Sequence, residues 1–353
     1  MQYIRLLPLY ANKNTSVLFP RQRIMRYNSL NNIILATSLL NNFTREISSS
    51  SSSSASMMTT PTTTQSSSSN GADDCLLPEH MQSYKVINNT IVSSDSNLLT
   101  IALPSQRSIL GWEPNIPTCI SISKVEEESG NILKKSYSPI SHPSQSNNFQ
   151  LLVKSYPHRV GGGVGSYLCN LNIGDEIQAK VKPQRIMHNH PHVHNRWKYV
   201  GLIAGGTGIA PLYQLLMILL KNDDHCKIQV LSINRVEEDI LQKKELDNIV
   251  KEYPDRVSVT YSLTGSDIEV DTDEGYKIGR GDTQLALDSL PHPSLGKDVM
   301  IFVCGKDGFV EHWGGPVGRA PNNPDGSKGK KIQGELLGVL GKAGYDASQV
   351  FKY

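Results

Sequence analysis

A glycine-rich turn between an apolar strand and an apolar helix constrains the fold of this chain more than any other feature. Residues 200–204 are apolar or Gly, the turn reads Gly-Gly-Thr-Gly over 205–208, and residues 212–220 are almost wholly apolar. This order predicts a buried strand, a tight turn and a helix, and Pro211 suits the first helical turn. Glycines let the backbone approach a phosphate closely, and the free N–H groups of a helix start attract it. The turn is therefore a phosphate-binding loop, or else only a connection within an α/β core.

This turn matches neither of two common phosphate-binding motifs. It is not the G-x-G-x-x-G dinucleotide fingerprint, and it lacks the lysine of a P-loop. The chain has 353 residues, which leaves room for about two domains and a tail. A net charge of +2 gives no general attraction to nucleic acid, so no nucleic-acid partner is expected. The five cysteines are scattered without a C-x-x-C pair, which predicts free thiols.

The first 75 residues have the composition of a targeting segment followed by a low-complexity stretch. No acidic residue precedes Glu46, whereas positive charges are spread among Leu, Ile and Ser: Arg5, Lys13, Arg21, Arg23, Arg26 and Arg45. This pattern predicts a mitochondrial transit peptide, the alternative being a tail without a targeting role. Residues 48–70 are mostly Ser and Thr, which cannot bury enough surface to fold. The apolar run 33–40 is far shorter than the roughly 20 residues that cross a bilayer.

Short alternating segments begin the globular part of the chain. Residues 84–87, 97–103 and 116–125 combine apolar and polar positions in the manner of strands, which predicts a small antiparallel barrel or sandwich. The extended stretch 134–141 adds two lysines, a tyrosine and serines, whose side chains suit a phosphate, a ring face and a ring nitrogen. An ordinary strand that ends at Pro139 explains the same residues.

A second glycine-rich turn follows at residues 161–165 and opens a short predicted helix. It is another place where backbone N–H groups suit a phosphate. Further along, strands are predicted over 227–233, 257–263 and 299–303, alternating with helices as in a parallel α/β domain. One of these helices is expected to start at Glu237, with acidic residues at its positive end. The Gly- and Pro-rich segment 314–334 is expected to be a loop.

Taken in order, seven motifs resemble those of the ferredoxin reductase superfamily, and in particular the NADH-cytochrome b5 reductase family. They are Lys-x-Tyr-Ser-Pro from Lys135, Val-Lys-x-Tyr ending at Tyr156, the Gly-rich Ser-Tyr-Leu turn, Gly-Asp-Glu-Ile from Gly174, Ala-Gly-Gly-Thr-Gly-Ile-Ala-Pro from Ala204, Asn-x-x-Glu-x-Asp-Ile-Leu from Asn234 and Cys304-Gly305. The resemblance extends from about Tyr84 to Tyr353. It implies a two-domain fold. An antiparallel β-barrel FAD-binding domain (76–197) is followed by a parallel-sheet α/β domain that binds the nicotinamide nucleotide (198–353).

The resemblance also implies roles for individual residues. On the FAD side, Lys135 meets the pyrophosphate, Tyr137 lies against the isoalloxazine ring, and Ser138 hydrogen-bonds near its N5 atom. Lys154 and Tyr156 line the flavin, and one turn holds the pyrophosphate: Gly163, Val164, Gly165 and Ser166. On the NADH side, Asp239 binds the adenosine ribose, and the residues beside the pyridine nucleotide are Gly205, Gly206, Thr207, Gly208, Cys304 and Gly305. Ser138 and Cys304 are the candidate catalytic residues.

Several of these positions have an ordinary structural explanation as well. Cys304 suits a small buried residue at a strand end, Asp239 suits a helix-start acid, and Tyr353 fits either a flavin neighbour or an exposed terminus. Four alternating histidines over 188–194 stand where the family has a Gly-Pro-x-Gly bridge. They suit one face of a metal site, but no Cys or carboxylate nearby completes it, so a solvated inter-domain linker is predicted and no metal.

The chain departs from the family pattern at three further places. Lys135 stands where the family has Arg, and a lysine cannot make a bidentate phosphate contact. The usual turn serine falls on Gly165, and Lys306 follows Cys304-Gly305 in place of proline. The first two departures predict weaker FAD binding than in typical members, and the third limits the resemblance beyond Gly305.

The implied function is a flavoprotein oxidoreductase that passes electrons from NADH through FAD to a one-electron haem acceptor such as cytochrome b5. The cofactors carry the chemistry, and the protein positions them. The sequence shows neither a haem domain nor the cysteine spacing of an iron–sulfur site, so the acceptor is expected to be a separate protein. A monomer in peripheral contact with a membrane is expected. The alternatives are a mitochondrial redox-assisted cytochrome assembly factor with the same fold, and a scaffold that has lost its flavin.

Overall fold

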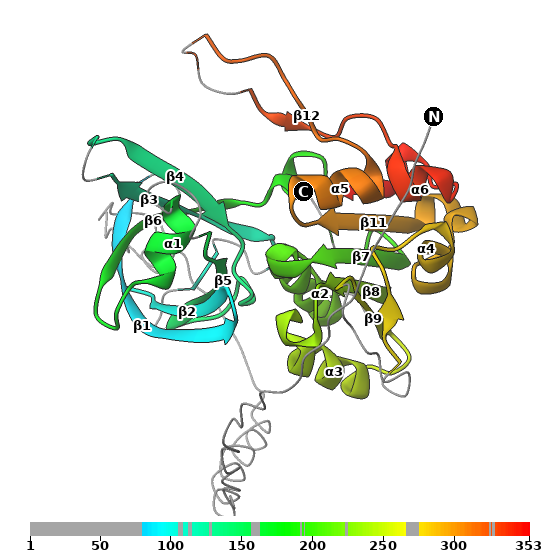
Figure 1. Ribbon diagram of the computed structural model, residues 1–353, viewed down its shortest axis with the longest axis horizontal. Helices are drawn as coiled ribbons and strands as arrows, with labels where there is room; N and C mark the ends of the chain where they lie inside the picture. The colour runs from blue at the N-terminus through cyan, green and yellow to red at the C-terminus, as the bar shows by residue number, and fades with distance from the viewer. Residues whose placement is uncertain are drawn as a thin grey trace, which may run out of the picture. The chain divides into compact units, whose positions relative to one another are not determined.

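The computed structural model describes residues 80–353, apart from 105–108, 112–114, 127–128, 157–162, 191–192, 194, 223–224, 266–274, 325 and 327–328. The described residues belong to one compact unit and contain two separate six-stranded sheets (Figure 1). The predicted targeting segment lies outside the described residues. Within the described ranges, we find no helix that is long and apolar enough to cross a membrane.

The first sheet is antiparallel, with strand order β4-β3-β6-β1-β2-β5. Its strands are β1 (Gln82–Ser93), β2 (Ser96–Ala102), β3 (Thr118–Val125), β4 (Ile132–Tyr137), β5 (Asn148–Lys154) and β6 (Glu176–Pro183). A bridge between Pro139 and Leu151 brings the chain after β4 against β5, so the ring of strands closes. Leu99 and Ile101 of β2 are fully buried at alternate positions, as a half-buried strand requires. The structure confirms the predicted antiparallel barrel.

The second sheet is parallel throughout, with strand order β10-β9-β8-β7-β11-β14. Its strands are β7 (Tyr199–Gly205), β8 (Lys227–Asn234), β9 (Val257–Leu263), β10 (Lys277–Ile278), β11 (Val299–Cys304) and β14 (Val350–Lys352). The described helices are α1 (Gly163–Cys169) in the barrel domain and α2 (Ile209–Asn222), α3 (Lys243–Glu252), α4 (Thr283–Ser289), α5 (Asp307–Gly314) and α6 (Gly338–Lys342) in the second domain. The short 3-10 turns are η1 (Arg185–His188), η2 (Gly206–Gly208), η3 (Glu237–Asp239), η5 (Pro293–Asp298) and η6 (Ala347–Gln349).

Helices cover both faces of this parallel sheet (Figure 1). Leu202 of β7 belongs to a core cluster with residues of α2 and α3, whereas Ile203 belongs to a second cluster with residues of α4, α5 and α6. Successive side chains of a strand point to opposite faces, so a strand buried on both faces must be apolar at every position. The apolar run at 200–204 meets this requirement, and the predicted α/β domain is confirmed.

Three local predictions were wrong. The helix expected from Glu237 is only the single turn η3, because Ile240 is extended (φ −74°, ψ 96°), and α3 begins after the left-handed Gln242 (φ 60°). The loop expected over 314–334 contains a two-stranded sheet of β12 (Gly318–Arg319) and β13 (Lys331–Ile332). The histidine segment is not simply solvated, because Ile186 and Val193 are buried in a core cluster.

Buried amide side chains join the two domains. Gln214 of α2 is fully buried, and its Oε1 accepts the Thr118 backbone N–H at 2.7 Å and the Gln184 Nε2 at 2.9 Å. Its own Nε2 donates to the carbonyl of Ser141 at 2.9 Å. Buried polar groups are costly unless they are hydrogen-bonded, so this satisfied network fixes α2 against the barrel.

His142 lies next to this contact in a His-x-Ser turn. Its Nδ1 accepts the backbone N–H of Ser144 at 3.1 Å, and its buried Nε2 has no hydrogen-bond partner within the described residues. Burial, assisted by the charge of Lys221, lowers the pKa of His142 to about 4. The imidazole therefore stays neutral at neutral pH.

We expect the free energy of unfolding to fall as the pH drops from 6.5 to about 4, because the unfolded chain binds a proton at His142 in this window and the folded chain does not. The loss should be about 2 kcal/mol, allowing for the partial exposure of the ring. Denaturant unfolding across this range should show a smaller loss for His142→Gln. His292→Gln is the matched control, since His292 occupies an exposed His-x-Ser turn of the same geometry. Identical pH profiles for His142→Gln and the unmodified protein would contradict this assignment.

Candidate functional site

A cavity of about 750 Å³ is lined by residues of both domains. The barrel contributes the ends of β4 and β5 and the segment that follows β6. The second domain contributes η2 and the residues at the carboxyl ends of β8 and β11. Ligands of open parallel sheets bind at this edge of the strands. The cavity is large enough for a sizeable cofactor.

The charges that line this cavity are mostly positive. Its cations are Lys135, Lys154, Lys182, Arg185, Arg235, Arg280, Lys306 and Lys331, and its anions are Asp95 and Asp239. A concave site with this excess of positive charge attracts phosphate groups. The cavity therefore suits nucleotides that carry a pyrophosphate.

The barrel wall brings together the residues that the sequence predicted for FAD. Lys135, Tyr137, Ser138, Lys154 and Tyr156 all line the cavity. The Lys135 ammonium lies 5.2 Å from the ring centroid of Tyr137 and 5.3 Å from that of Tyr156. Two aromatic rings and a cation thus share one surface, which suits a planar ring system next to a phosphate.

Tyr137 provides a test of whether this wall fits a flavin. The residue is 8% exposed, and its hydroxyl is buried without a hydrogen-bond partner in the part of the chain that the structure describes. A buried hydroxyl without a partner is costly unless a ligand supplies one. Tyr137 lines the cavity beside the Lys135 ammonium, and its unpartnered hydroxyl lies near Gly165 in the predicted pyrophosphate turn. The barrel wall therefore fits FAD, which favours a flavin site over a scaffold that has lost its flavin.

The predicted pyrophosphate turn lies behind this wall. Gly163, Val164, Gly165 and Ser166 begin α1 and are not among the residues that line the cavity. A Cβ atom at Gly165 would lie 2.5 Å from the carbonyl oxygen of Lys154 and 3.6 Å from the Tyr137 hydroxyl. The serine that the family usually has in this turn has no room at position 165, which explains physically why Gly165 stands there. Residues 157–162, which precede the turn, lie outside the described residues.

The opposite wall is built on η2. Gly205, Gly206, Thr207 and Gly208 all line the cavity and lead directly into α2, whose first turn includes Pro211. A Cβ atom at Gly208 would overlap the backbone carbonyl of Cys304, so only glycine lets this turn lie against the end of β11. The free N–H groups at this helix start favour a phosphate.

Cys304 and Gly305 end β11 beside this turn and line the cavity. Burial raises the pKa of the Cys304 thiol to about 12, so the thiol is neutral and not a nucleophile. The C-terminal Tyr353 also lines the cavity, and its hydroxyl donates to Gln184 Oε1 at 2.9 Å. Tyr353 is interpreted from the sequence either as a neighbour of the flavin or as an exposed terminus, and the second interpretation is therefore wrong.

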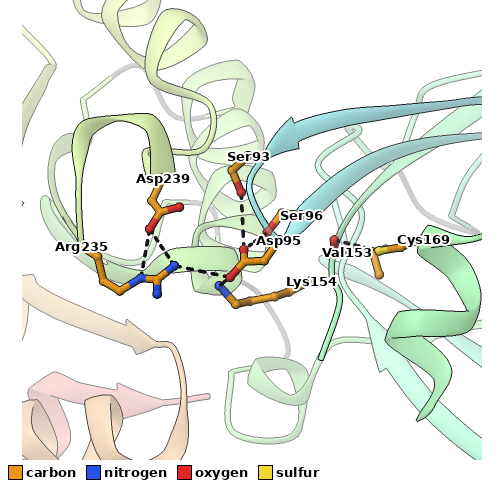
Figure 2. Close-up of polar contacts among 8 residues, drawn as sticks. All are labelled: Ser93, Asp95, Ser96, Val153, Lys154, Cys169, Arg235 and Asp239. Atoms are coloured by element: carbon orange, nitrogen blue, oxygen red, sulfur yellow. Dashed lines mark hydrogen bonds and ion pairs between the residues drawn. The ribbon is translucent and has the colours of Figure 1, made fainter. Parts of the chain in front are cut away.

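Asp239 lies in η3 and lines the cavity, and its side chain is 12% exposed. Its carboxylate accepts the Nε of Arg235 at 3.0 Å, and Arg235 also lies within 3.5 Å of Asp95 in the barrel domain (Figure 2). Asp95 in turn pairs with Lys154. The predicted ribose ligand is thus part of a charged row that reaches the predicted flavin wall.

The sequence matches two family models, one for each domain. Residues 83–185 match the oxidoreductase FAD-binding domain, and residues 202–313 match the oxidoreductase NAD-binding domain. NADH-cytochrome b5 reductase 2 of Saccharomyces cerevisiae is 33% identical over 262 residues, which cover 74% of this chain and 79% of that protein. The chain belongs to the NADH-cytochrome b5 reductase family. It is an FAD-dependent oxidoreductase that uses NADH.

Other relatives agree with this membership. NADH-cytochrome b5 reductase 2-A of Vanderwaltozyma polyspora is 30% identical over 265 residues, covering 74% of this chain and 80% of that protein. The cytochrome b5 reductase domain of Ulva prolifera nitrate reductase shares the fold, with a TM-score of 0.61, 21% identity, and coverage of 79% of this chain and 99% of that one.

Among the described residues, no group of His, Cys, Asp or Glu is arranged to hold a metal. Two of the four alternating histidines, His192 and His194, lie outside the described residues.

Sequence reasoning missed several residues of this reductase site. Asp95 and Gln184 line the cavity, and Lys306 places its ammonium 5.6 Å from the ring centroid of Tyr156 in the other domain. Gln214 does not line the cavity but holds Gln184. Its signal was visible, because Gln214 is the only amide within the apolar run 212–220. Asp95 had no such signal, since an acid in a polar turn is ordinary.

Proposed function

We propose that this reductase passes the electrons of NADH, one at a time, to a haem protein of the cytochrome b5 type. When bound, FAD would supply the required chemistry, because a flavin can accept a hydride and release single electrons. The names of the two curated relatives reported above support a cytochrome b5-like acceptor and do not favour the assembly-factor alternative.

The single observation that carries the proposal is the shared cavity. The aromatic and hydroxyl residues of β4 line the same space as Cys304 and the η2 turn. Hydride transfer needs the two reacting rings in contact, and binding them in one cavity supplies the proximity. The chain's own groups bind and orient, and no general acid or base is required of them for the hydride step.

Two measurements test this proposal. Purified protein should be yellow, should release FAD on denaturation, and should bleach when NADH is added without oxygen. The reduced protein should then reduce oxidised cytochrome b5 in a stopped-flow mixing experiment. A folded protein that binds no FAD would contradict the assignment of the flavin site. A flavoprotein that bleaches with NADH but leaves cytochrome b5 oxidised would contradict only the proposed acceptor.

We expect NADH to be preferred over NADPH by at least about tenfold in kcat/KM, or roughly 1.4 kcal/mol. The largely buried Asp239 can accept hydrogen bonds from a ribose diol and repels a 2′-phosphate. Asp239→Thr should reduce the preference, mainly by improving the use of NADPH. Glu238→Gln is the matched control, because Glu238 is an exposed neighbour that does not line the cavity. Equal use of both nucleotides by the unmodified protein would show that Asp239 does not select NADH over NADPH.

A mitochondrial location, a monomeric state and peripheral membrane contact belong to the same proposal. Support for the location comes from the basic and acid-free composition that precedes Glu46. A fusion of residues 1–60 to a fluorescent protein should enter mitochondria. A version with its arginines changed to glutamines is the control and should stay in the cytosol. A diffuse signal from the unmodified fusion would count against targeting.

A further inference from the structure

Four alternating charges extend from the barrel to the nucleotide domain along the cavity wall (Figure 2). Lys154, at the end of β5, pairs with Asp95 in the turn between β1 and β2. The Nη2 atom of Arg235 lies 3.5 Å from the Asp95 carboxylate and 3.0 Å from that of Asp239. Arg235 therefore meets two carboxylates, one from each domain.

Asp95 is held in place independently of Arg235. Its carboxylate accepts the hydroxyl of Ser96 at 3.0 Å, and its backbone carbonyl accepts the N–H of Ser155 at 2.8 Å. Burial alone would raise the pKa of Asp95, but the hydrogen bonds and charges of Lys154, Ser96 and Arg235 hold it below its usual value. A fixed anion thus faces the nucleotide domain at neutral pH.

We propose that Asp95, a barrel residue, determines nucleotide specificity by engaging the guanidinium of Arg235 and keeping it from a 2′-phosphate. The inference rests on the proposed function, because it takes Asp239 as the neighbour of the adenosine ribose. Asp95 is a positioning residue here, since it acts through Arg235.

The chemistry of arginine makes this restraint necessary. A guanidinium binds phosphate through two parallel hydrogen bonds, and an arginine near this ribose is the usual means of accepting NADPH. The side chain of Arg235 is 63% exposed, so it could turn toward a ligand if nothing held it. Asp239 alone gives the Arg235 guanidinium one carboxylate partner, and Asp95 gives it a second partner from the barrel domain.

Binding of two adenosine nucleotides separates this effect from catalysis. Calorimetry on the purified full chain should compare adenosine 2′,5′-bisphosphate with 5′-AMP, which differ only in the 2′-phosphate. Asp95→Asn should improve the affinity ratio in favour of the bisphosphate by about fivefold, the size expected for an exposed ion pair. In an Arg235→Gln background the same substitution should change the ratio by less than about twofold.

Asp288→Asn is the matched control, because it removes the same charge from an exposed position of α4 outside the cavity. The ratio should not change in that variant. If flavin content shows that Asn disturbs the turn, Asp95→Ser is the second neutral variant and must shift the ratio in the same direction. Normal AMP binding with an unchanged ratio, or an equal gain in both Arg235 backgrounds, would overturn the inference alone. Failure of the unmodified protein to bind AMP would overturn the proposed nucleotide site as well.

Discussion

Gly208→Ala is expected to destabilise the protein by about 3 kcal/mol and to lower kcat/KM for NADH by about a hundredfold. A Cβ atom at this position would overlap the Cys304 carbonyl and lie 2.8 Å from the Gly305 backbone nitrogen. Both neighbours are backbone atoms at the end of β11, so neither can rotate away as a side chain would. The η2 turn would have to move, and with it the residues predicted to lie beside the pyridine nucleotide.

Gly308→Ala is the matched control for this prediction. Gly308 lies in α5 near the same edge of the sheet, and a Cβ atom there would meet no atom within 4 Å. Alanine is the better helix former, so this variant should be as stable as the unmodified protein or slightly more stable. Denaturant unfolding and NADH-dependent reduction of ferricyanide measure both variants. Normal stability and rate in Gly208→Ala would show that the turn does not need its close approach to β11.

The parallel domain was the most predictable part of the fold. Strand β9 has the predicted limits, Val257–Leu263, because its β-branched and aromatic residues alternate with serines, a pattern typical of a strand. Acidic residues at the start of a predicted helix are less informative about how long the helix is. The run from Glu237 suits a full helix as well as the single turn η3, and the left-handed Gln242 that separates η3 from α3 leaves no mark in the composition. The strands β12 and β13 have two residues each, which is too short to show alternation.

The site was predictable where backbone geometry dictates the residue type. Glycines at 205, 206 and 208 and the aromatic at 137 are visible in the sequence because few other residues can replace them. Partners that meet through side chains are not visible in this way. Asp95 and Arg235 lie far apart in the chain, and although Arg235 stands out in the sequence as a possible ligand of the NADPH phosphate, Asp95 looks like an ordinary surface charge. Their pairing follows only from the arrangement of the two domains, which no local pattern encodes.

Lys352→Met is expected to destabilise the reductase by about 3 kcal/mol. Lys352 is 2% exposed, although it stands next to the C-terminus. Its Nζ donates to three backbone carbonyls, those of Gly314 at 3.1 Å, Pro316 at 3.0 Å and Glu335 at 2.8 Å. An ammonium has three N–H donors, so this cage satisfies all of them and the lysine is charged despite the burial that lowers its pKa. Methionine has a similar length and would take the ammonium away from all three carbonyls, of which that of Gly314 keeps another donor, the N–H of Leu337 at 3.2 Å.

Lys342→Met is the matched control, because Lys342 is an exposed residue of α6 and the same substitution there removes no buried contact. Equilibrium unfolding in denaturant should separate the two variants by most of the predicted 3 kcal/mol or so. The cage also ties the segment around β12 and β13 to the last strand, since the Lys352 backbone N–H donates to Gln333 Oε1 at 2.7 Å. The next residue is Tyr353, whose place in the cavity wall depends on that strand. Lys352→Met should therefore raise KM for NADH as well, and a variant with unchanged stability and unchanged KM would show that the buried charge is dispensable.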